Sequence, residues 1–250
     1  MEILDTFLNH TSVRSFDNQA LDKEVKKHLV AAAQSGSSSN FVQAYSIIEI
    51  QDIKKRRELG KIANCEEYVV NNGVFYVFVA DLYRNFQISK PKNENVEAFG
   101  TIEALLVSVI DTTIAAQNMS VYAESQDLGI CYIGGIRNNL FKVAEILDLP
   151  KFTLPVFGLS VGIPKQKNEA KPRLPQDEII KVDTYQMNTE SIKTYDVTMD
   201  DYYSNRTSNQ QQATWTQKIQ DHFQITRRPE VLDFLMQQGF EFKNKENRND

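Results

Sequence analysis

The longest segment without a helix breaker runs from about Val96 to Leu128, where there is no proline and the only glycine is Gly100. Its apolar side chains would spread around almost the whole circumference of a helix. A helix of this kind is covered on most sides, by a protein core or by another subunit. The segment therefore predicts one long, largely buried helix, which Gly129 ends as its C-terminal cap.

Four shorter runs, rich in β-branched and aromatic residues, lie before and after this segment. They predict strands at Ala44–Ile50, Val74–Ala80, Ile130–Ile133 and Leu154–Ile163. The second run is apolar at every position, which is typical of a strand buried on both faces. Strands and helical patterns alternate along the chain, and the predicted helices outnumber the strands.

The composition of the chain changes at Pro164. Residues 164–175 are polar, basic and proline-rich, which predicts an extended connector. Polar helical patterns follow at Asp200–Arg206, Thr214–Phe223 and Pro229–Gln238. We therefore expect a core over residues 1–163, followed by a connector and helical arm over residues 164–250, within one domain overall.

The charge balance excludes one broad class of function. The formal net charge of the 250 residues is −5, whereas nucleic-acid binders usually carry a basic excess. The basic run Lys54–Arg57 is surrounded by Glu49, Asp52 and Glu58, as is typical of the solvated face of a helix.

Other residue types narrow the class further. Cys65 and Cys131 are the only cysteines, so neither a disulfide scaffold nor a zinc site built from cysteines is expected. The three histidines are far apart along the chain, so no metal site is expected. The N-terminus is acidic where a signal peptide is basic, and polar residues interrupt the most apolar stretch, 104–121. We expect a soluble cytoplasmic protein.

One motif is shared with the serine hydrolases. Gly158–Gly162 matches the Gly-x-Ser-x-Gly pattern of serine hydrolases, in which Ser160 would be the nucleophile. That pattern requires a strand, a sharp turn and a helix, but here Ile163 and Pro164 continue an extended segment. A strand whose glycines let another backbone pack closely is the favoured interpretation, and the serine hydrolase remains an alternative.

Two cationic clusters suggest a phosphate site. Arg14 lies in the run His10–Phe16, and Lys171 and Arg173 lie in the connector. If folding brings both clusters together, they form a socket for a phosphate group. The hydroxyl-rich loop Ser37–Asn40 and the strand end Tyr132–Gly135, where a flat ligand could approach the backbone, complete the parts that a flavin mononucleotide needs.

With these parts in view, the chain resembles the bacterial nitroreductases, in particular the FMN-dependent NAD(P)H:flavin oxidoreductase and oxygen-insensitive nitroreductase branch. The resemblance covers nearly the whole chain. The stretches that carry it are His10–Phe16, Ser37–Gln43, Val77–Asp81, Tyr132–Asn139, Leu154–Gly162, Lys171–Pro175 and Arg206–Trp215.

The resemblance implies an α+β fold, with a central, mostly antiparallel sheet flanked by helices, in an intertwined homodimer. Two FMN molecules would lie at the subunit interface, the long helix would supply dimer core, and the C-terminal arm would wrap the partner subunit. The implied activity is ping-pong hydride transfer from NAD(P)H, through the flavin N5, to nitroaromatics, quinones, free flavins or similar acceptors. A flavin- or nucleotide-binding module without turnover is a further alternative.

The resemblance also assigns residues to the cofactors. His10, Ser12, Arg14, Lys171 and Arg173 would hold the phosphate and ribityl oxygens of FMN. Ser38, Ser39 and Asn40 would line the pyrimidine side of the ring. Tyr132 and Ile133 would lead to the amide of Gly134 or Gly135 at N5, Glu66 would lie near the ring, and Arg206 would recognise the 2′-phosphate of NADPH. No side chain is assigned as a catalytic acid or base.

Two positions depart from the family pattern. Glu66 stands where the family usually has a glutamine, so we expect the negative charge to lower the flavin potential. Gln211 stands where the family often has a second arginine, which leaves the choice between NADPH and NADH open.

Overall fold

The computed structural model describes residues 3–90, 97–166, 168–206 and 210–242. The chain divides into two compact units. Residues 1–168 and 228–250 form what we call the core unit, and residues 169–227 form the insert unit. Each unit is described by itself.

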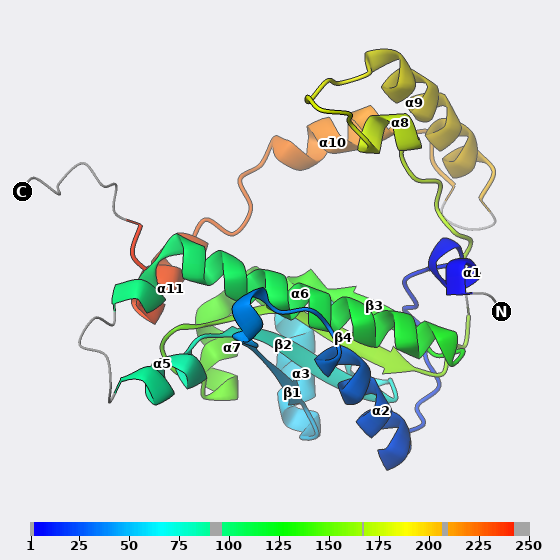
Figure 1. The fold of residues 1–250 in the computed structure, drawn as a ribbon. Helices are drawn as coiled ribbons and strands as arrows, with labels where there is room; N and C mark the ends of the chain where they lie inside the picture. The colour runs from blue at the N-terminus through cyan, green and yellow to red at the C-terminus, as the bar shows by residue number, and fades with distance from the viewer. Residues whose placement is uncertain (1–2, 91–96, 167, 207–209, 243–250) are drawn as a thin grey trace, which may run out of the picture. The chain divides into compact units, whose positions relative to one another are not determined.

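A four-stranded sheet forms the centre of the described core unit (Figure 1). Its strands are β1 (Tyr45–Glu49), β2 (Val74–Asp81), β3 (Gly129–Ile133) and β4 (Thr153–Gly162). They lie in the order β1-β2-β4-β3, and all three pairings are antiparallel. The four predicted strands and the antiparallel sheet are confirmed.

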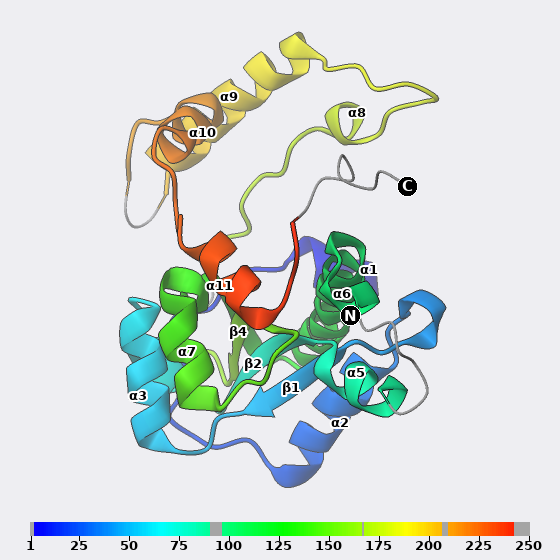
Figure 2. The same cartoon turned by 90° about the vertical axis from the view of Figure 1, so that its left-hand side faces the viewer.

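Helices cover both faces of this sheet (Figure 2). Alternate residues of β2 face opposite sides, so that Phe75 and Val77 belong to one hydrophobic cluster and Tyr76 and Phe78 to another. The first face packs against α3 (Ile53–Ile62), α4 (Glu66–Val70), the 3-10 helix η3 (Gly134–Asn139) and α7 (Leu140–Leu147). The second packs against α2 (Lys23–Gln34) and α6 (Ile102–Ser125).

Helix α6 is shorter than predicted, because Thr101 caps its start and Gln126 its end. A 3-10 helix, η2 (Glu97–Gly100), precedes it, and Gly129 begins β3 rather than ending the helix. A Cβ atom at Gly129 would lie 2.7 Å from Cγ2 of Val13. The glycine therefore serves a close approach between segments and not a helix cap.

The two sides of α6 differ in an unexpected way. Its buried side carries small and polar residues, among them Ser108, Asp111 and Thr112. Large aliphatic side chains lie on the other side, where Ile102, Leu106 and Ile110 are each about half exposed. The predicted burial around the helix is therefore met on one side only within the described chain.

Among the described helices, α6 alone is long and apolar enough to cross a membrane by length and composition, with a mean hydropathy of 1.3 over 18 residues. By that measure, the polar residues within 104–121 do not make the helix too polar to cross a membrane, contrary to expectation. The core helix of a soluble protein passes the same test, and the buried side of α6 packs against the sheet.

Smaller elements complete the core unit: α1 (Ile3–Leu8), η1 (Ser39–Phe41), α5 (Tyr83–Ser89) and α11 (Val231–Gln238). The sequence pattern placed α11 in the polar arm, but Phe234 is 1 % exposed and packs in a cluster with residues of α7 and β4. Gly239 ends α11 with a φ of 97°, a conformation that favours glycine.

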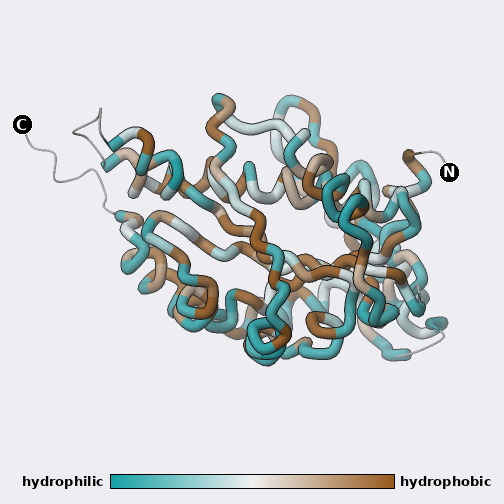
Figure 3. The backbone as a smooth tube through the Cα atoms, turned by 90° about the horizontal axis from the view of Figure 1, so that it is seen from below, coloured by the Kyte–Doolittle hydropathy of each residue, from teal (hydrophilic) through white to brown (hydrophobic). Residues whose placement is uncertain are grey.

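The insert unit consists of α8 (Gln176–Ile179), α9 (Thr189–Ser204) and α10 (Trp215–Phe223). Helix α9 begins well before the predicted Asp200, because the Asn188 side chain caps it by accepting from Ser191 N. The core of this unit is small, with Tyr195, Met199 and Tyr203 as its buried hydrophobic residues among those described. Figure 3 shows hydrophobic and hydrophilic residues interspersed along the backbone of the described chain.

Candidate functional site

The run His10–Phe16 lies along the outer edge of β3. Ser12 forms a parallel bridge with Ile130, and Val13 N donates to Ile130 O at 2.9 Å. The Ser12 carbonyl also accepts from Asn168 Nδ2 at 3.1 Å. Val13 and Phe16 are buried at 2 % exposure, whereas Arg14 between them is exposed. The backbone thus holds the arginine at the sheet edge with its guanidinium outside the core.

Arg14 lies near two side chains that keep their protons, those of Cys131 and Tyr68. Burial raises the pKa of the Cys131 thiol to about 11, and the positive charge of Arg14 opposes this rise. Burial likewise raises the pKa of the Tyr68 phenol to about 12, again against the charge of Arg14. Arg14 forms no ion pair with a carboxylate among the described residues, so its charge is available to a ligand.

A buried carboxylate ties down the hydroxyl-rich loop. Asp111 of α6 is 1 % exposed and accepts from Ser38 Oγ at 2.7 Å, Ser39 N at 3.1 Å and Ala44 N at 3.0 Å. The loop needs this support, because several of its residues have a positive φ that side chains rarely adopt. Those residues are Asn40 at 46°, Phe41 at 58° and Gln43 at 49°.

The paired glycines after β3 have different surroundings. A Cβ atom at Gly135 would lie 2.5 Å from the Ala63 carbonyl oxygen, so the two backbones touch there. A Cβ atom at Gly134 would meet only the Arg137 guanidinium, at 3.6 Å. Gly135 is therefore required for packing against the end of α3, and Gly134 is the one with free space beside it.

Two further predicted site residues, His10 and Glu66, are held by neighbouring helices. His10 Nδ1 lies 2.7 Å from Glu124 Oε1 at the end of α6. Glu66 is the first residue of α4 and is partly buried. A Cβ atom at Gly60 would lie 2.7 Å from the Glu66 Cα, so close packing between α3 and α4 sets the position of the glutamate.

Tyr132 and Ile133 point to opposite faces of the sheet. Ile133 is 4 % exposed in the cluster that includes Cys131. The Tyr132 phenol lies on the α6 side, where it accepts from Ser120 Oγ at 2.9 Å. Burial raises its pKa to about 12, and that hydrogen bond opposes the rise. At this strand end the two faces of the sheet therefore carry different side chains.

The remaining predicted site residues belong to the insert unit. Lys171 and Arg173 are exposed, on either side of Pro172, whose carbonyl accepts from Tyr195 Oη at 2.9 Å. The Arg206 guanidinium carbon lies 5.6 Å from the centroid of the Tyr202 ring and 5.9 Å from that of Tyr203. The predicted convergence of Lys171 and Arg173 with Arg14 involves both units and stays a prediction.

The sequence analysis missed two residues, Asp111 and Arg137, whose side chains hydrogen-bond to backbone groups near the site. Asp111 is one of the polar residues that interrupt the apolar stretch 104–121, and a lone carboxylate in such a helix indicates a buried partner. Arg137 was missed as well. Its guanidinium donates to the Val156 carbonyl, and burial lowers its pKa, as does the neighbouring Arg228.

The serine hydrolase alternative fails on geometry. Ser160 is fully buried in β4, where its hydroxyl donates to the Tyr68 carbonyl at 2.7 Å and accepts from Asn72 Nδ2 at 3.0 Å. The neighbouring glycines serve packing, because a Cβ atom at Gly162 would lie 2.7 Å from Gly73 N. The described residues contain no metal-binding group of histidine, cysteine and carboxylate side chains.

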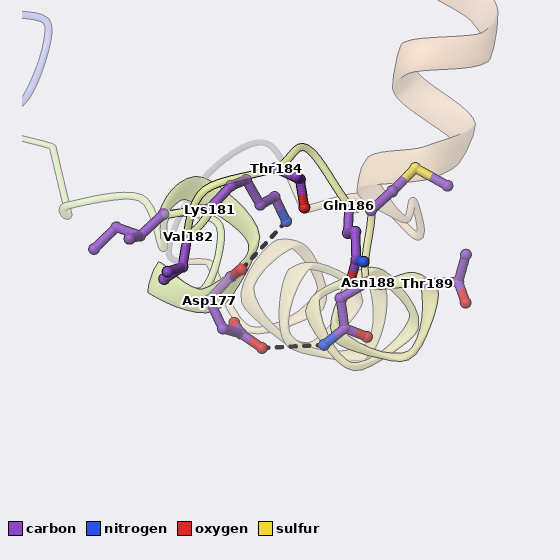
Figure 4. A pocket seen from close by; sticks show the side chains of 9 residues that line it. Asp177, Lys181, Val182, Thr184, Gln186, Asn188 and Thr189 are labelled. Carbon is purple, nitrogen blue, oxygen red and sulfur yellow. Dashed lines mark hydrogen bonds between the residues drawn. The ribbon is translucent and has the colours of Figure 1, made fainter.

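A hollow in the insert unit lies apart from the predicted residues (Figure 4). It has a volume of about 520 Å³ and lies between α8 and the start of α9. Across it Asn188 Nδ2 donates to Asp177 Oδ2 at 3.3 Å, and Lys181 Nζ donates to the Asp177 carbonyl, also at 3.3 Å. The residues that line it form hydrogen bonds with one another, and they include none of the cations discussed above.

Comparisons with known proteins agree with these features. Residues 8–163 match the model of the nitroreductase family, and residues 171–243 match the nitroreductase family, C-terminal domain. The chain is 46 % identical over 242 residues to an "FMN reductase (NADPH)" of Bacillus subtilis, covering 95 % of this chain and 97 % of that protein. It is 40 % identical over 240 residues to a "CR(VI) reductase" of a Pseudomonas species, covering 94 % and 97 %.

Solved structures extend the likeness to the fold. The NfrA1 nitroreductase from B. subtilis superposes with a TM-score of 0.91 at 45 % identity, covering 96 % of this chain and 99 % of that one. An NADPH:FMN oxidoreductase from Vibrio harveyi, complexed with NAD+, gives a TM-score of 0.86 at 33 % identity, with the same coverage.

Proposed function

Because the chain belongs to the nitroreductase family, we propose that it is an FMN-dependent oxidoreductase that takes hydride from NADPH. The observation that carries this proposal is the agreement between relatives named for FMN and NADPH and a set of cations without carboxylate partners. The cations are those that the sequence pattern assigned to the phosphates.

The residues present fit FMN. Arg14, Lys171 and Arg173 form no ion pair with a carboxylate in the part of the chain that the structure describes. Guanidinium and ammonium groups are the donors that a phosphate prefers. The space beside Gly134 leaves the backbone there open to a flat ring, since even a Cβ atom would meet nothing closer than 3.6 Å.

In this proposal the chain binds and orients its cofactor. Arg14, Lys171 and Arg173 hold the phosphate, with His10 and Ser12 beside the ribityl chain. Ser38, Ser39 and Asn40 present polar groups to the ring from a loop that Asp111 holds in place. The remaining contacts come from Glu66, Tyr132, Ile133, Gly134 and Gly135.

When bound, FMN supplies the redox chemistry, as hydride acceptor from NADPH and electron donor to the second substrate in a ping-pong cycle. Cys131 and Tyr68, near Arg14, do not supply an acid or base near neutral pH, because burial raises the pKa of Cys131 to about 11 and that of Tyr68 to about 12. Both groups stay protonated and uncharged near neutral pH.

We also propose that the chain works as a soluble, cytoplasmic homodimer. Ile102, Leu106 and Ile110 repeat every four residues on the outer side of α6, and each is about half exposed. A row of large aliphatic side chains on one helix face is typical of a subunit interface. The partner of this row is a second copy of the chain, with the insert unit of residues 169–227 wrapped over it.

The acceptor is proposed at the level of class. Relatives are named for FMN and for Cr(VI), which differ greatly in size and in chemistry. We propose that this chain reduces nitroaromatics, quinones or free flavins at the same open ring face.

Purification and a double-mutant cycle test the proposal. The protein is expected to bind one FMN per chain and to oxidise NADPH when a quinone is present; a colourless protein that does not retain added FMN contradicts it. Arg14→Gln and Arg173→Gln should each weaken FMN binding by about tenfold or more. If both cations bind one phosphate, their losses differ from additivity by more than about 0.5 kcal/mol.

A further inference from the structure

Tyr203 gathers three positive charges in the core of the insert unit. Its ring is 5 % exposed. The Nζ of Lys218 lies 4.5 Å from the ring centroid, the Nζ of Lys171 lies 5.5 Å from it, and the Cζ of Arg206 lies 5.9 Å from it. Cations at these distances are attracted by the ring face. The ring thus places Lys218, which the sequence analysis did not single out, beside the two cations already assigned to phosphates.

Lys171, Arg206 and Lys218 form no ion pair with a carboxylate within the described residues. The ion pairs of the insert unit join Lys181 to Glu178 and Lys193 to Glu190, away from Tyr203. Like charges gathered around one ring repel one another, and a bound anion relieves that repulsion. The cluster therefore has the charge of a phosphate-binding site.

The Lys218 ammonium is held in this place from two directions. Its Nζ donates to Gln211 Oε1 at 3.1 Å, and Gln211 N in turn donates to the Tyr203 carbonyl at 3.2 Å. The start of α10 is set by Asp196, whose Oδ1 accepts from Thr216 N at 2.8 Å. Lys218 is thus a positioned side chain, and its charge lies directly beside residue 211.

We propose that Lys218 supplies the second positive charge for the 2′-phosphate of NADPH, next to Arg206 and in place of an arginine at position 211. NADPH and NADH differ only in that phosphate, so Lys218 determines the choice between them. Gln211 acts as a positioning residue that orients the ammonium. The inference rests on the proposed function, because it needs NADPH to bind at the insert unit.

The test compares Lys218→Gln with the native enzyme, both loaded with FMN, in steady-state oxidation of NADPH and NADH with one quinone. Lys218→Gln should lower kcat/KM for NADPH by about tenfold or more, the loss expected for one charge-assisted hydrogen bond, and should leave NADH within twofold. Lys218→Arg should restore most of the NADPH activity. Equal losses with both cofactors, or no loss with either, would overturn the inference.

Inhibition by nucleotide fragments separates binding from folding. Adenosine 2′,5′-bisphosphate, which carries the 2′-phosphate, should inhibit NADH oxidation by Lys218→Gln about tenfold more weakly than that by the native enzyme. ADP should inhibit both alike. Lys193→Gln removes the same charge from an exposed pair in the same unit. It should change neither kcat/KM for NADPH nor kcat/KM for NADH. A uniform weakening by Lys193→Gln would mean that net charge, and not the position of Lys218, determines the effect.

A gain-of-function variant completes the test. Gln211→Arg adds the arginine that the family often has, and in the Lys218→Gln background it should restore NADPH selectivity. Failure to restore it would contradict the shared role of positions 211 and 218. Retained FMN and unchanged NADH oxidation in these variants would show that the proposed function stands even where the inference fails; loss of FMN and of both activities in the native enzyme would remove both.

Discussion

The core unit and the insert unit hold themselves together in different ways. In the core unit, a sheet of four described strands lies between two layers of helices, and both faces are packed by buried side chains. In the insert unit, three described residues are buried, while Ile179, Ile180, Val182, Tyr185 and Met187 are more than half exposed. The first unit is stabilised by its own interior, whereas the second has a small interior and leaves these apolar side chains exposed.

This difference has a physical consequence for function. Buried apolar area is the main source of stability, so a unit with a small core opens easily unless a ligand or another surface covers it. The cations of the insert unit and its exposed apolar residues are both groups that gain from such cover. We therefore expect the core unit to be stable alone and the insert unit to depend on what it binds.

The largest effect is expected from matched truncations in the two interiors. Phe75→Ala removes a fully buried ring from the core unit and should lower the free energy of unfolding by about 3–5 kcal/mol, measured by urea denaturation. Met199→Ala removes a side chain that is 1 % exposed in the insert unit. It should mainly speed hydrogen exchange in α9 and α10. If Met199→Ala weakens the main unfolding transition as much as Phe75→Ala does, the two units unfold together and the contrast is wrong.

Asp111→Ala tests whether the core unit prepares the ring-binding loop. The change leaves the amides of Ser39 and Ala44, of which the second is buried, without their acceptor and should cost about 3 kcal/mol of stability. FMN binding should weaken too, because the loop loses its support. Ser38→Ala is the milder change, since it removes the hydroxyl that donates to Asp111 and accepts from Gln43 N but leaves the two backbone amides their carboxylate. Unchanged FMN affinity in Asp111→Ala would show that the loop holds its shape without the carboxylate.

The buried thiol of Cys131 predicts a loss of stability at alkaline pH. Burial raises its pKa from 9.0 to about 11, so the folded protein keeps a proton that the unfolded chain releases. Stability from this group is fully present below pH 9 and falls by at most about 1.4 kcal/mol per pH unit as the pH rises toward 11. Cys131→Ala should flatten this slope in urea denaturation between pH 9 and 10. An unchanged slope would place the titrating group elsewhere.

Glu66→Gln gives the smallest expected effect. A carboxylate near a reduced, negatively charged flavin disfavours reduction, so removing its charge should raise the midpoint potential, on the order of tens of millivolts. Spectroscopic titration against a reference dye measures the change. Glu67→Gln, at the neighbouring exposed position, is the matched control. A potential that stays the same or falls in Glu66→Gln would place the glutamate away from the ring.

The sequence analysis succeeded where the information is local along the chain. Alternating and continuous apolar runs predicted the four strands, and Pro164 after the Gly-x-Ser-x-Gly motif argued correctly against a nucleophile at Ser160. It failed where the role of a residue depends on a contact with a residue far away in the sequence. Gly129 looked like a helix cap but begins β3 against Val13. One local signal was also missed, since Asn188 caps α9, which starts at Thr189.

By itself, the sequence determined the strands, the family and the cations that suit a phosphate, because each can be recognised from residue types within a short stretch. Only the tertiary structure decided which side of α6 is buried, how Asp111 holds a loop 67 to 73 residues away in sequence, and that Lys218 shares a ring with Arg206. The physical reason is that hydrogen bonds and cation–ring contacts depend on distances in space, which chain folding sets and spacing along the sequence does not reveal.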